Sequence, residues 1–344
     1  MFNRKRLTKN LCLFLLGQIC SICVSVSGLC LSVLNTKYQH IPFSLNAIPY
    51  FFGAVFFTVF YLILFYKRNL YRNFIKKARK NILSHLVTIV MYLFASWSIY
   101  HGYYMSSPLK IFSILSLTII STILGNYFIL RYRFKWIHYF SIMIFYIGII
   151  VALISEYRTD QNQMKSFNQF THHSVFDEHT DVVVGDLLIL FAAVFFGLFF
   201  NLKEQCLKRD GFLFTQILFN FALLVLFPVI GLILEYEKIV KYFQNFSFYT
   251  NESKILFCYL TSMFFHVNIL EYLLRQFSSI NCILCLLTAN FYRFLIELYL
   301  EWIHYESLYP LSFVIQIFFH GFFLYSKILD DYDEVGSETS QEFE

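Results

Sequence analysis

Long apolar runs separated by short polar segments make up most of this chain. A helix needs about 20 predominantly apolar residues to cross the hydrocarbon core of a bilayer. Windows of that length give ten candidate spans: 11–34, 46–66, 82–104, 109–130, 136–155, 183–201, 212–234, 254–273, 279–300 and 308–326. Because the runs are long and mostly unbroken, they favour membrane helices over the alternating pattern of a membrane β-barrel. The pattern predicts an all-α polytopic membrane protein with ten transmembrane helices.

The composition agrees with this interpretation. Of the 344 residues, 58% are hydrophobic and only 14% are charged, whereas an average soluble domain has roughly 25% charged residues. The net charge is +5, and the basic residues lie between the apolar runs, so the pattern gives little support to nucleic-acid binding. We therefore expect the chain to lie in a lipid bilayer and to have no nucleic-acid partner.

The distribution of basic residues predicts the orientation in the membrane. With a cytosolic N-terminus, most of the 27 Lys and Arg residues fall in inside segments, as the positive-inside rule requires. An even number of spans then places the C-terminus in the cytosol as well. Two N-x-S/T sequons, at Asn245 and Asn251, both lie in the loop between the seventh and eighth spans. That loop is outside in this orientation, where glycosylation is possible. A Golgi, an endosomal and a plasma membrane are all compatible with this topology.

A polar connector over residues 156–184 separates five spans in 1–155 from five in 185–328. Residues 329–344 form an acidic tail, which predicts a disordered cytosolic segment.

A short segment recurs in the two halves. Trp136-Ile-His138-Tyr139 opens the fifth span, and Trp302-Ile-His304-Tyr305 precedes the tenth. With an odd number of helices in each half, two repeats must have opposite orientations in the membrane. Two inverted five-helix repeats are an architecture of secondary transporters, with the substrate site between the repeats near the midplane.

Several stretches resemble a known family. They are Gly185-Asp186-Leu187-Leu188, Phe195-Phe196-Gly197, Asn201-Leu-Lys-Glu204 with Lys208, and Leu287-Thr288-Ala289-Asn290-Phe291-Tyr292. These segments are similar to the F-type members of solute carrier family 35, in the drug/metabolite transporter superfamily. The resemblance implies a ten-helix carrier. Because relatives in the wider family carry nucleotide sugars, nucleosides and related metabolites, it also suggests a cargo of that kind, including nucleobase-like solutes.

Polar residues inside the ninth span are the first site candidates. Asn290, Arg293 and Glu297 have spacings that place them on one face of a helix. A buried Arg293 offers a fixed positive charge for a phosphate or carboxylate of a substrate. The alternatives are a structural pair of Arg293 with Glu297 and an Arg293 side chain that snorkels outward.

Other spans carry further candidates. In the eighth span, Glu271 and His266 are titratable and are candidates for proton coupling, although Glu271 also has Arg275 four residues later as an interfacial ion-pair partner. Asn126, Asn220 and Tyr100 are candidates for a substrate-binding cavity. The alternative for each of the three is hydrogen bonding between helices.

The motifs in the sequence favour a carrier over an enzyme. The sequence has no P-loop, no G-x-S-x-G and no H-E-x-x-H motif, and its histidines show no diagnostic metal spacing. We therefore expect no catalytic residue, no cofactor and no metal site. The leading hypothesis is a secondary transporter that moves a small organic solute by alternating access. A membrane-embedded transferase and a transporter-derived receptor or scaffold are the alternatives, and the sequence makes no prediction of an oligomeric state.

Overall fold

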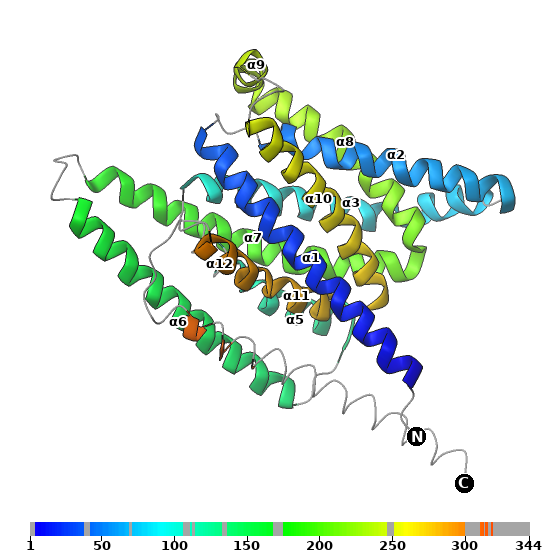
Figure 1. The fold of residues 1–344 in the computed structure, drawn as a ribbon. Coiled ribbons are helices and arrows are strands. Elements are labelled where there is room, and N and C mark those ends of the chain that lie inside the picture. The colour runs from blue at the N-terminus through cyan, green and yellow to red at the C-terminus, as the bar shows by residue number, and fades with distance from the viewer. Residues whose placement is uncertain are drawn as a thin grey trace, which may run out of the picture. The chain divides into compact units, whose positions relative to one another are not determined.

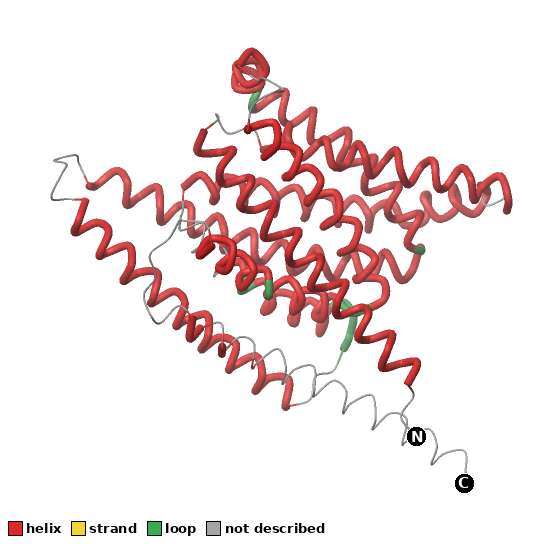
Figure 2. The backbone as a smooth tube through the Cα atoms, in the orientation of Figure 1, coloured by secondary structure: helices red, strands yellow, loops and turns green. Residues whose placement is uncertain are grey.

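The structure is a computed structural model. The structure describes residues 4–37, 42–68, 71–105, 111, 114–132, 136–167, 175–245, 251–299, 310–312, 314–315 and 318. Figure 2 shows that this described backbone consists of helices joined by short loops. The helices are α1 (Arg4–Lys37), α2 (Pro42–Arg68), α3 (Tyr71–Met105), α5 (Thr118–Phe128), α6 (Trp136–Phe167), α7 (Val175–Asp210), α8 (Phe212–Leu234), α9 (Tyr236–Asn245), α10 (Asn251–Gln276), α11 (Ser279–Leu287) and α12 (Ala289–Tyr299).

Six segments of the described chain are long and apolar enough to cross a membrane: Leu11–Leu31, Asn81–Gly102, Val183–Asp210, Phe212–Leu234, Ser253–Gln276 and Ser279–Ile296. Two shorter apolar helical segments are Ala47–Val59 and His138–Val151. The chain is therefore a multi-pass membrane protein whose described elements are all helices. Most of the tenth predicted span, 308–326, and the tail 329–344 lie outside the described residues, so the count of ten spans stays a prediction.

Two predicted segments differ locally from the structure. Residues 279–300 were expected as one helix, but α11 ends at Leu287 and α12 begins at Ala289. At the interruption, the Thr288 hydroxyl donates to the Cys285 carbonyl at 2.6 Å, and the Thr288 backbone N–H bonds the same carbonyl at 3.2 Å. The helix therefore tightens to an i to i−3 bond at that point. The expected polar connector 156–184 is largely helical, because α6 extends to Phe167 and α7 begins at Val175.

Contacts divide the chain into two compact units: Met1–Arg131 with Phe176–Glu297, and Tyr132–Val175 with Leu298–Glu344. The second unit contains α6, with Phe145 and Ile149 buried. The first contains the remaining long helices. There, helices from early and late in the sequence pack on one another: α1 lies along α10 and α11, and α2 lies along α8 (Figure 1). This pairing explains why the first unit includes residues from both predicted halves.

Small residues at every fourth position of α1 allow a close approach to α11. These residues are Gly17, Ser21 and Ser25. A Cβ at Gly17 would lie 2.5 Å from the Cys285 sulfur, and the Ser21 and Ser25 hydroxyls donate to the carbonyls of Cys285 and Ala289. The register shows that α1 runs parallel to α11 and α12. Small residues that share one helix face are a common packing device between membrane helices.

Helix α7 repeats this arrangement against α5. Its small or polar residues Ala193, Gly197 and Asn201 also lie at every fourth position. Ser121 of α5 donates to the Ala193 carbonyl at 3.0 Å, and Asn201 donates to the Thr122 carbonyl at 3.0 Å. Thus α7 runs parallel to α5, as α1 runs parallel to α11.

Helices α1 and α7 each also have an antiparallel neighbour. Along α1 and α10, Cys20 contacts His266, while Leu31 packs in one cluster with Tyr259. Along α3 and α7, Asn81 donates to Asp210 at 2.6 Å, and Gly102 lies against Ile189. Both pairs therefore have opposite chain directions.

A single residue connects α7 to α8. Gly211 has φ +92°, in the left-handed region that favours glycine. This conformation turns the chain directly from Asp210, the last residue of α7, to Phe212, the first of α8. Helix α8 then lies along α2, where Gly53 contacts the side chain of Asn220.

Candidate substrate cavity

The first unit contains a cavity of about 160 Å³. Residues from α1, α2, α3, α7, α8 and α10 line it, so both halves of the sequence contribute to its wall. Most of the wall is aromatic or aliphatic; the polar groups come from hydroxyl side chains, His266 and Glu271. Such a lining, largely apolar with a few convergent polar groups, is typical of small-molecule sites.

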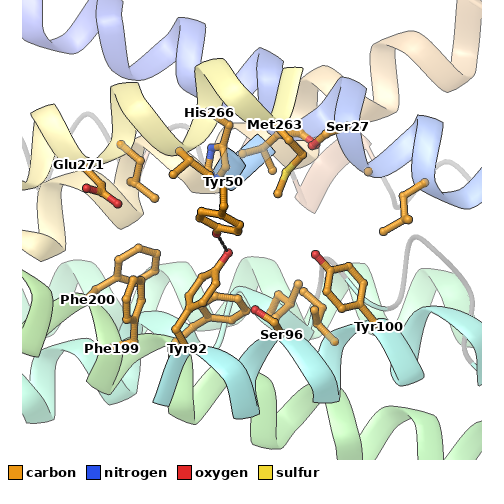
Figure 3. Close-up of a pocket in the computed structure, with 18 of the residues that line it drawn as sticks. Ser27, Tyr50, Tyr92, Ser96, Tyr100, Phe199, Phe200, Met263, His266 and Glu271 are labelled. Atoms are coloured by element: carbon orange, nitrogen blue, oxygen red, sulfur yellow. Dashed lines mark hydrogen bonds between the residues drawn. The ribbon is translucent and has the colours of Figure 1, made fainter. Parts of the chain in front are cut away.

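Two tyrosines from different helices meet in the cavity. The hydroxyls of Tyr50 on α2 and Tyr92 on α3 are hydrogen-bonded (Figure 3). The Tyr50 ring stacks on Phe227 with a centroid separation of 5.4 Å, and the Tyr92 ring lies 4.9 Å from Phe199. Aromatic packing therefore fixes both rings, and the hydroxyl pair links α2 to α3 beside the cavity.

A buried ion pair borders the cavity. Lys203 Nζ of α7 lies 3.2 Å from Glu271 Oε1 of α10, and the two side chains are 0% and 4% exposed. The Lys203 ammonium also lies 3.1 Å from the centroid of the Phe219 ring. The other carboxylate oxygen, Glu271 Oε2, has no hydrogen-bond partner. Glu271 lines the cavity, whereas Lys203 is not among the lining residues.

The ion pair corrects one expectation and adds a residue that the sequence analysis missed. Glu271 pairs with Lys203 rather than with Arg275, which is exposed and lies 5.9 Å from the Phe212 ring. The sixth span was expected to end at residue 201, which would place Lys203 in a loop. A usable signal was present, because a span extended to Asp210 places Lys203 within the apolar stretch.

Three predicted site residues line the cavity: Tyr100, His266 and Glu271. The His266 ring nitrogen Nδ1 lies 3.3 Å from the Cys20 sulfur, so this contact fixes the imidazole against α1. Figure 3 places Glu271 at one end of the labelled side chains and Tyr100 at the other, with the Tyr50–Tyr92 pair between them.

The two predicted asparagines lie elsewhere. Asn126 is fully buried and donates to Asn201 Oδ1 at 2.7 Å and to the Ser279 hydroxyl at 2.8 Å. Glu204 joins this cluster by accepting a bond from the Ser279 backbone N–H at 2.6 Å. Asn220 donates to the carbonyl and side-chain oxygens of Gln216, one turn away on α8. Neither Asn126 nor Asn220 lines the cavity.

The remaining predicted residues lie on α9, α10 and α12. Arg293 is 1% exposed and does not line the cavity. Asn290 and Glu297 share α12 with it, but their side chains lie outside the described residues, as do those of the sequon residues Asn245 and Asn251. Asn245 ends α9, and Asn251 begins α10.

Comparisons with known proteins agree with the fold. A solved structure described only as "Crystal structure of protein" superposes with a TM-score of 0.57 at 13% sequence identity, covering 90% of this chain and 95% of the other. At this identity the likeness shows the fold alone. No curated protein matches the sequence.

The family assignment comes from the sequence as a whole. The family model SLC35F, described as solute carrier family 35, matches residues 6–327. This match covers far more than half of the chain, including every helix that lines the cavity. It agrees with the multi-pass helical structure and points to a transporter rather than an enzyme. The chain therefore belongs to solute carrier family 35, in its SLC35F group.

Proposed function

We propose that this protein is a secondary transporter that binds a small organic solute in the central cavity and moves it by alternating access. One observation carries the proposal. Helices from both halves of the sequence enclose an aromatic cavity of about 160 Å³, and among the described residues of its wall Glu271 is the one carboxylate. Because the sequence carries no ATPase motif, the energy for uphill movement comes from exchange or from an ion gradient.

The helix registers support two inverted five-helix repeats. In two such repeats, α1 corresponds to α7, α3 corresponds to α10, and α5 corresponds to α11. The antiparallel pair formed by α1 and α10 then corresponds to the pair formed by α7 and α3. The parallel pair α1–α11 then corresponds to α7–α5. The cavity lies among these paired helices. Alternating access in such folds involves movement of one repeat against the other around a fixed site.

The size of the cavity bears on the cargo. An engineered protein cavity of about 150 Å³ binds benzene, so a cavity of about 160 Å³ accommodates a single-ring solute. Among the nucleotide-sugar-, nucleoside- and nucleobase-like solutes suggested by the family, the nucleobase-like class fits this conformation best. A nucleotide sugar would require a wider conformation.

Tyr100, His266 and Glu271 are the proposed contacts within the cavity, and Glu271 and His266 stay candidates for proton coupling. Asn126, Asn220, Asn290, Arg293 and Glu297 stay predicted substrate-binding residues. The alternative for Asn126 and Asn220 is hydrogen bonding between helices, and the alternatives for Arg293 are a structural pair with Glu297 and a side chain that snorkels outward.

We also propose that both termini are cytosolic. The excess of Lys and Arg in the predicted inside segments supports this orientation. It places the Asn245 and Asn251 sequons on the opposite side, in the lumen of a Golgi or endosomal compartment or outside the cell.

Uptake by proteoliposomes that contain the purified protein tests the function. The panel contains nucleotide sugars, nucleosides, nucleobases and small aromatic amines, each with and without a pH gradient, and protein-free liposomes are the control. We expect saturable, protein-dependent uptake of at least one single-ring solute. Absence of uptake across the panel by folded, inserted protein would contradict the proposal. An Arg293→Ala variant tests the predicted role of that residue: loss of uptake in a folded variant would include α12 in the substrate site, and unchanged uptake would make Arg293 structural.

A further inference from the structure

The side chains around Lys203 form a binding site for an ammonium group. Lys203 Nζ has a carboxylate oxygen of Glu271 at 3.2 Å on one side and the face of Phe219 at 3.1 Å on another. A carboxylate together with an aromatic face is the combination that binds organic cations in proteins. In this conformation the chain's own lysine occupies that environment.

The free oxygen of the same carboxylate belongs to the cavity. Glu271 lines the cavity, its side chain is 4% exposed, and Oε2 has no hydrogen-bond partner. A buried carboxylate oxygen without a partner is costly, so a donor from a bound solute would satisfy it. Among the lining residues that the structure describes, Glu271 is the one acid, and there is no Lys or Arg.

Aromatic faces extend from this carboxylate through the cavity. In Figure 3, Phe199 and Phe200 lie at the same end of the close-up as Glu271. Phe199 also stacks on Phe219, with ring centroids 5.7 Å apart. A flat solute with a positive group at one end therefore finds both ring surfaces and a negative charge. An anionic solute would meet no positive charge there, because Lys203 is fully buried and is not one of the residues that line the cavity.

We propose that the cavity selects a small aromatic solute with one positively charged nitrogen, and that this nitrogen displaces Lys203 from Glu271 during transport. The inference rests on the proposed transporter function and names its substrate class. Lys203 acts as a tethered counter-ion: it neutralises Glu271 when the cavity is empty and competes with the solute's cation when the cavity is filled. A buried charge of either sign without a counter-ion is strongly unfavourable. The exchange therefore keeps Glu271 paired in both states, and the displaced Lys203 releases its proton to solvent, so that it is neutral while the solute's cation is bound.

Binding of three matched probes tests the inference. Benzylammonium, benzyl alcohol and benzoate have the same ring and differ in charge; calorimetry measures their binding to the full-length protein in lipid nanodiscs. We expect wild type to bind benzylammonium at least about tenfold more tightly than benzyl alcohol, a free-energy difference of about 1.4 kcal/mol, and benzoate most weakly. Equal binding of all three probes, or tighter binding of benzoate, would overturn the inference.

Four variants separate the roles of the two charges. Glu271→Gln should remove the preference for benzylammonium, and Lys203→Met should strengthen benzylammonium binding because the competing ammonium is gone. The double variant Lys203→Met/Glu271→Gln leaves no unpaired buried charge and so avoids the expected folding defect; it should bind benzylammonium and benzyl alcohol alike. Arg275→Met is the control, since this exposed α10 cation is one turn from Glu271 but not paired with it, and binding should not change. A double variant that keeps the cation preference would overturn the inference.

Uptake distinguishes this inference from the proposed function. Selective binding of benzylammonium without uptake of any solute would contradict the transporter proposal and leave the cation site standing. Uptake of a neutral solute that is unchanged in Glu271→Gln would overturn the cation site and leave the transporter standing.

Discussion

The side-chain amide of Asn126 on α5 donates to the side-chain oxygen of Asn201 on α7 at 2.7 Å, with both residues fully buried. The hydroxyl of Ser279, the first residue of α11, donates to the same Asn201 oxygen at 2.9 Å. Three helices therefore meet at one asparagine.

Replacing Asn201 with Leu should destabilise the protein. The change removes two acceptor contacts and leaves the Asn126 amide without one of its partners, at a cost of about 1–3 kcal/mol. Thermal unfolding in detergent, followed by tryptophan fluorescence, measures the loss. Asn268→Leu is the matched control, because the amide of Asn268 donates within its own helix to Phe264, and its midpoint should fall less. Equal midpoints for Asn201→Leu and wild type would contradict the structural role.

Gly197 should not tolerate alanine. A Cβ there would overlap the Ser121 side chain and lie 2.8 Å from the Thr122 backbone nitrogen, so α5 and α7 would have to separate. Overpacking of this kind costs about 1–3 kcal/mol. The same unfolding measurement should show a lower midpoint for Gly197→Ala than for Val194→Leu, which adds volume on an exposed face of α7. A Gly197→Ala midpoint at or above that of the control would contradict the close packing.

The hydroxyls of Tyr50 and Tyr92 should be energetically coupled. Removing either one leaves the other buried without this bond, so each single Tyr→Phe variant should lose about 1 kcal/mol of stability. The double variant should lose less than the sum, and a double-mutant cycle measures the difference. Strictly additive effects would show that the bond does not contribute to the fold.

Glycosylation tests the proposed orientation. If the loop between α9 and α10 is lumenal or extracellular, the chain from a eukaryotic host should migrate faster after glycosidase treatment. The double variant Asn245→Gln/Asn251→Gln should show no such shift. A chain that glycosidase leaves unchanged, together with protection of an engineered cysteine in this loop from external reagents, would favour the opposite orientation.

Much of the helical architecture was predictable because a bilayer sets a minimum length and apolarity for each span. The apolar runs therefore closely predicted the segments of α1, α3, α8 and α10 that are apolar enough to cross a membrane, whereas α1 and α3 themselves begin several residues earlier. The interruption at Thr288 was not predictable from hydropathy, since it depends on a hydroxyl bonding locally in a specific packing environment.

The candidate site was predictable only in part. Tyr100, His266 and Glu271 were identified as polar residues within spans, and they line the cavity. Lys203 was missed because charge alone marked it as a loop residue. Its partner Glu271 lies 68 residues later on another helix, and sequence spacing within one helix pointed to Arg275 instead. Tertiary packing decides between the two cations.

Uptake by a cavity-filling variant shows whether the solute passes through this cavity. Ser96 is 2% exposed and lines the cavity, so Ser96→Leu should fill part of the site, whereas Ser262→Leu makes the same change on α10 outside the lining. For the solute that wild type transports in proteoliposomes, we expect at least about a tenfold loss of initial uptake rate in Ser96→Leu, which corresponds to about 1.4 kcal/mol of activation free energy. We expect a rate near wild type in Ser262→Leu. Wild-type uptake by a folded Ser96→Leu protein would contradict the assignment of the cavity as the transport site.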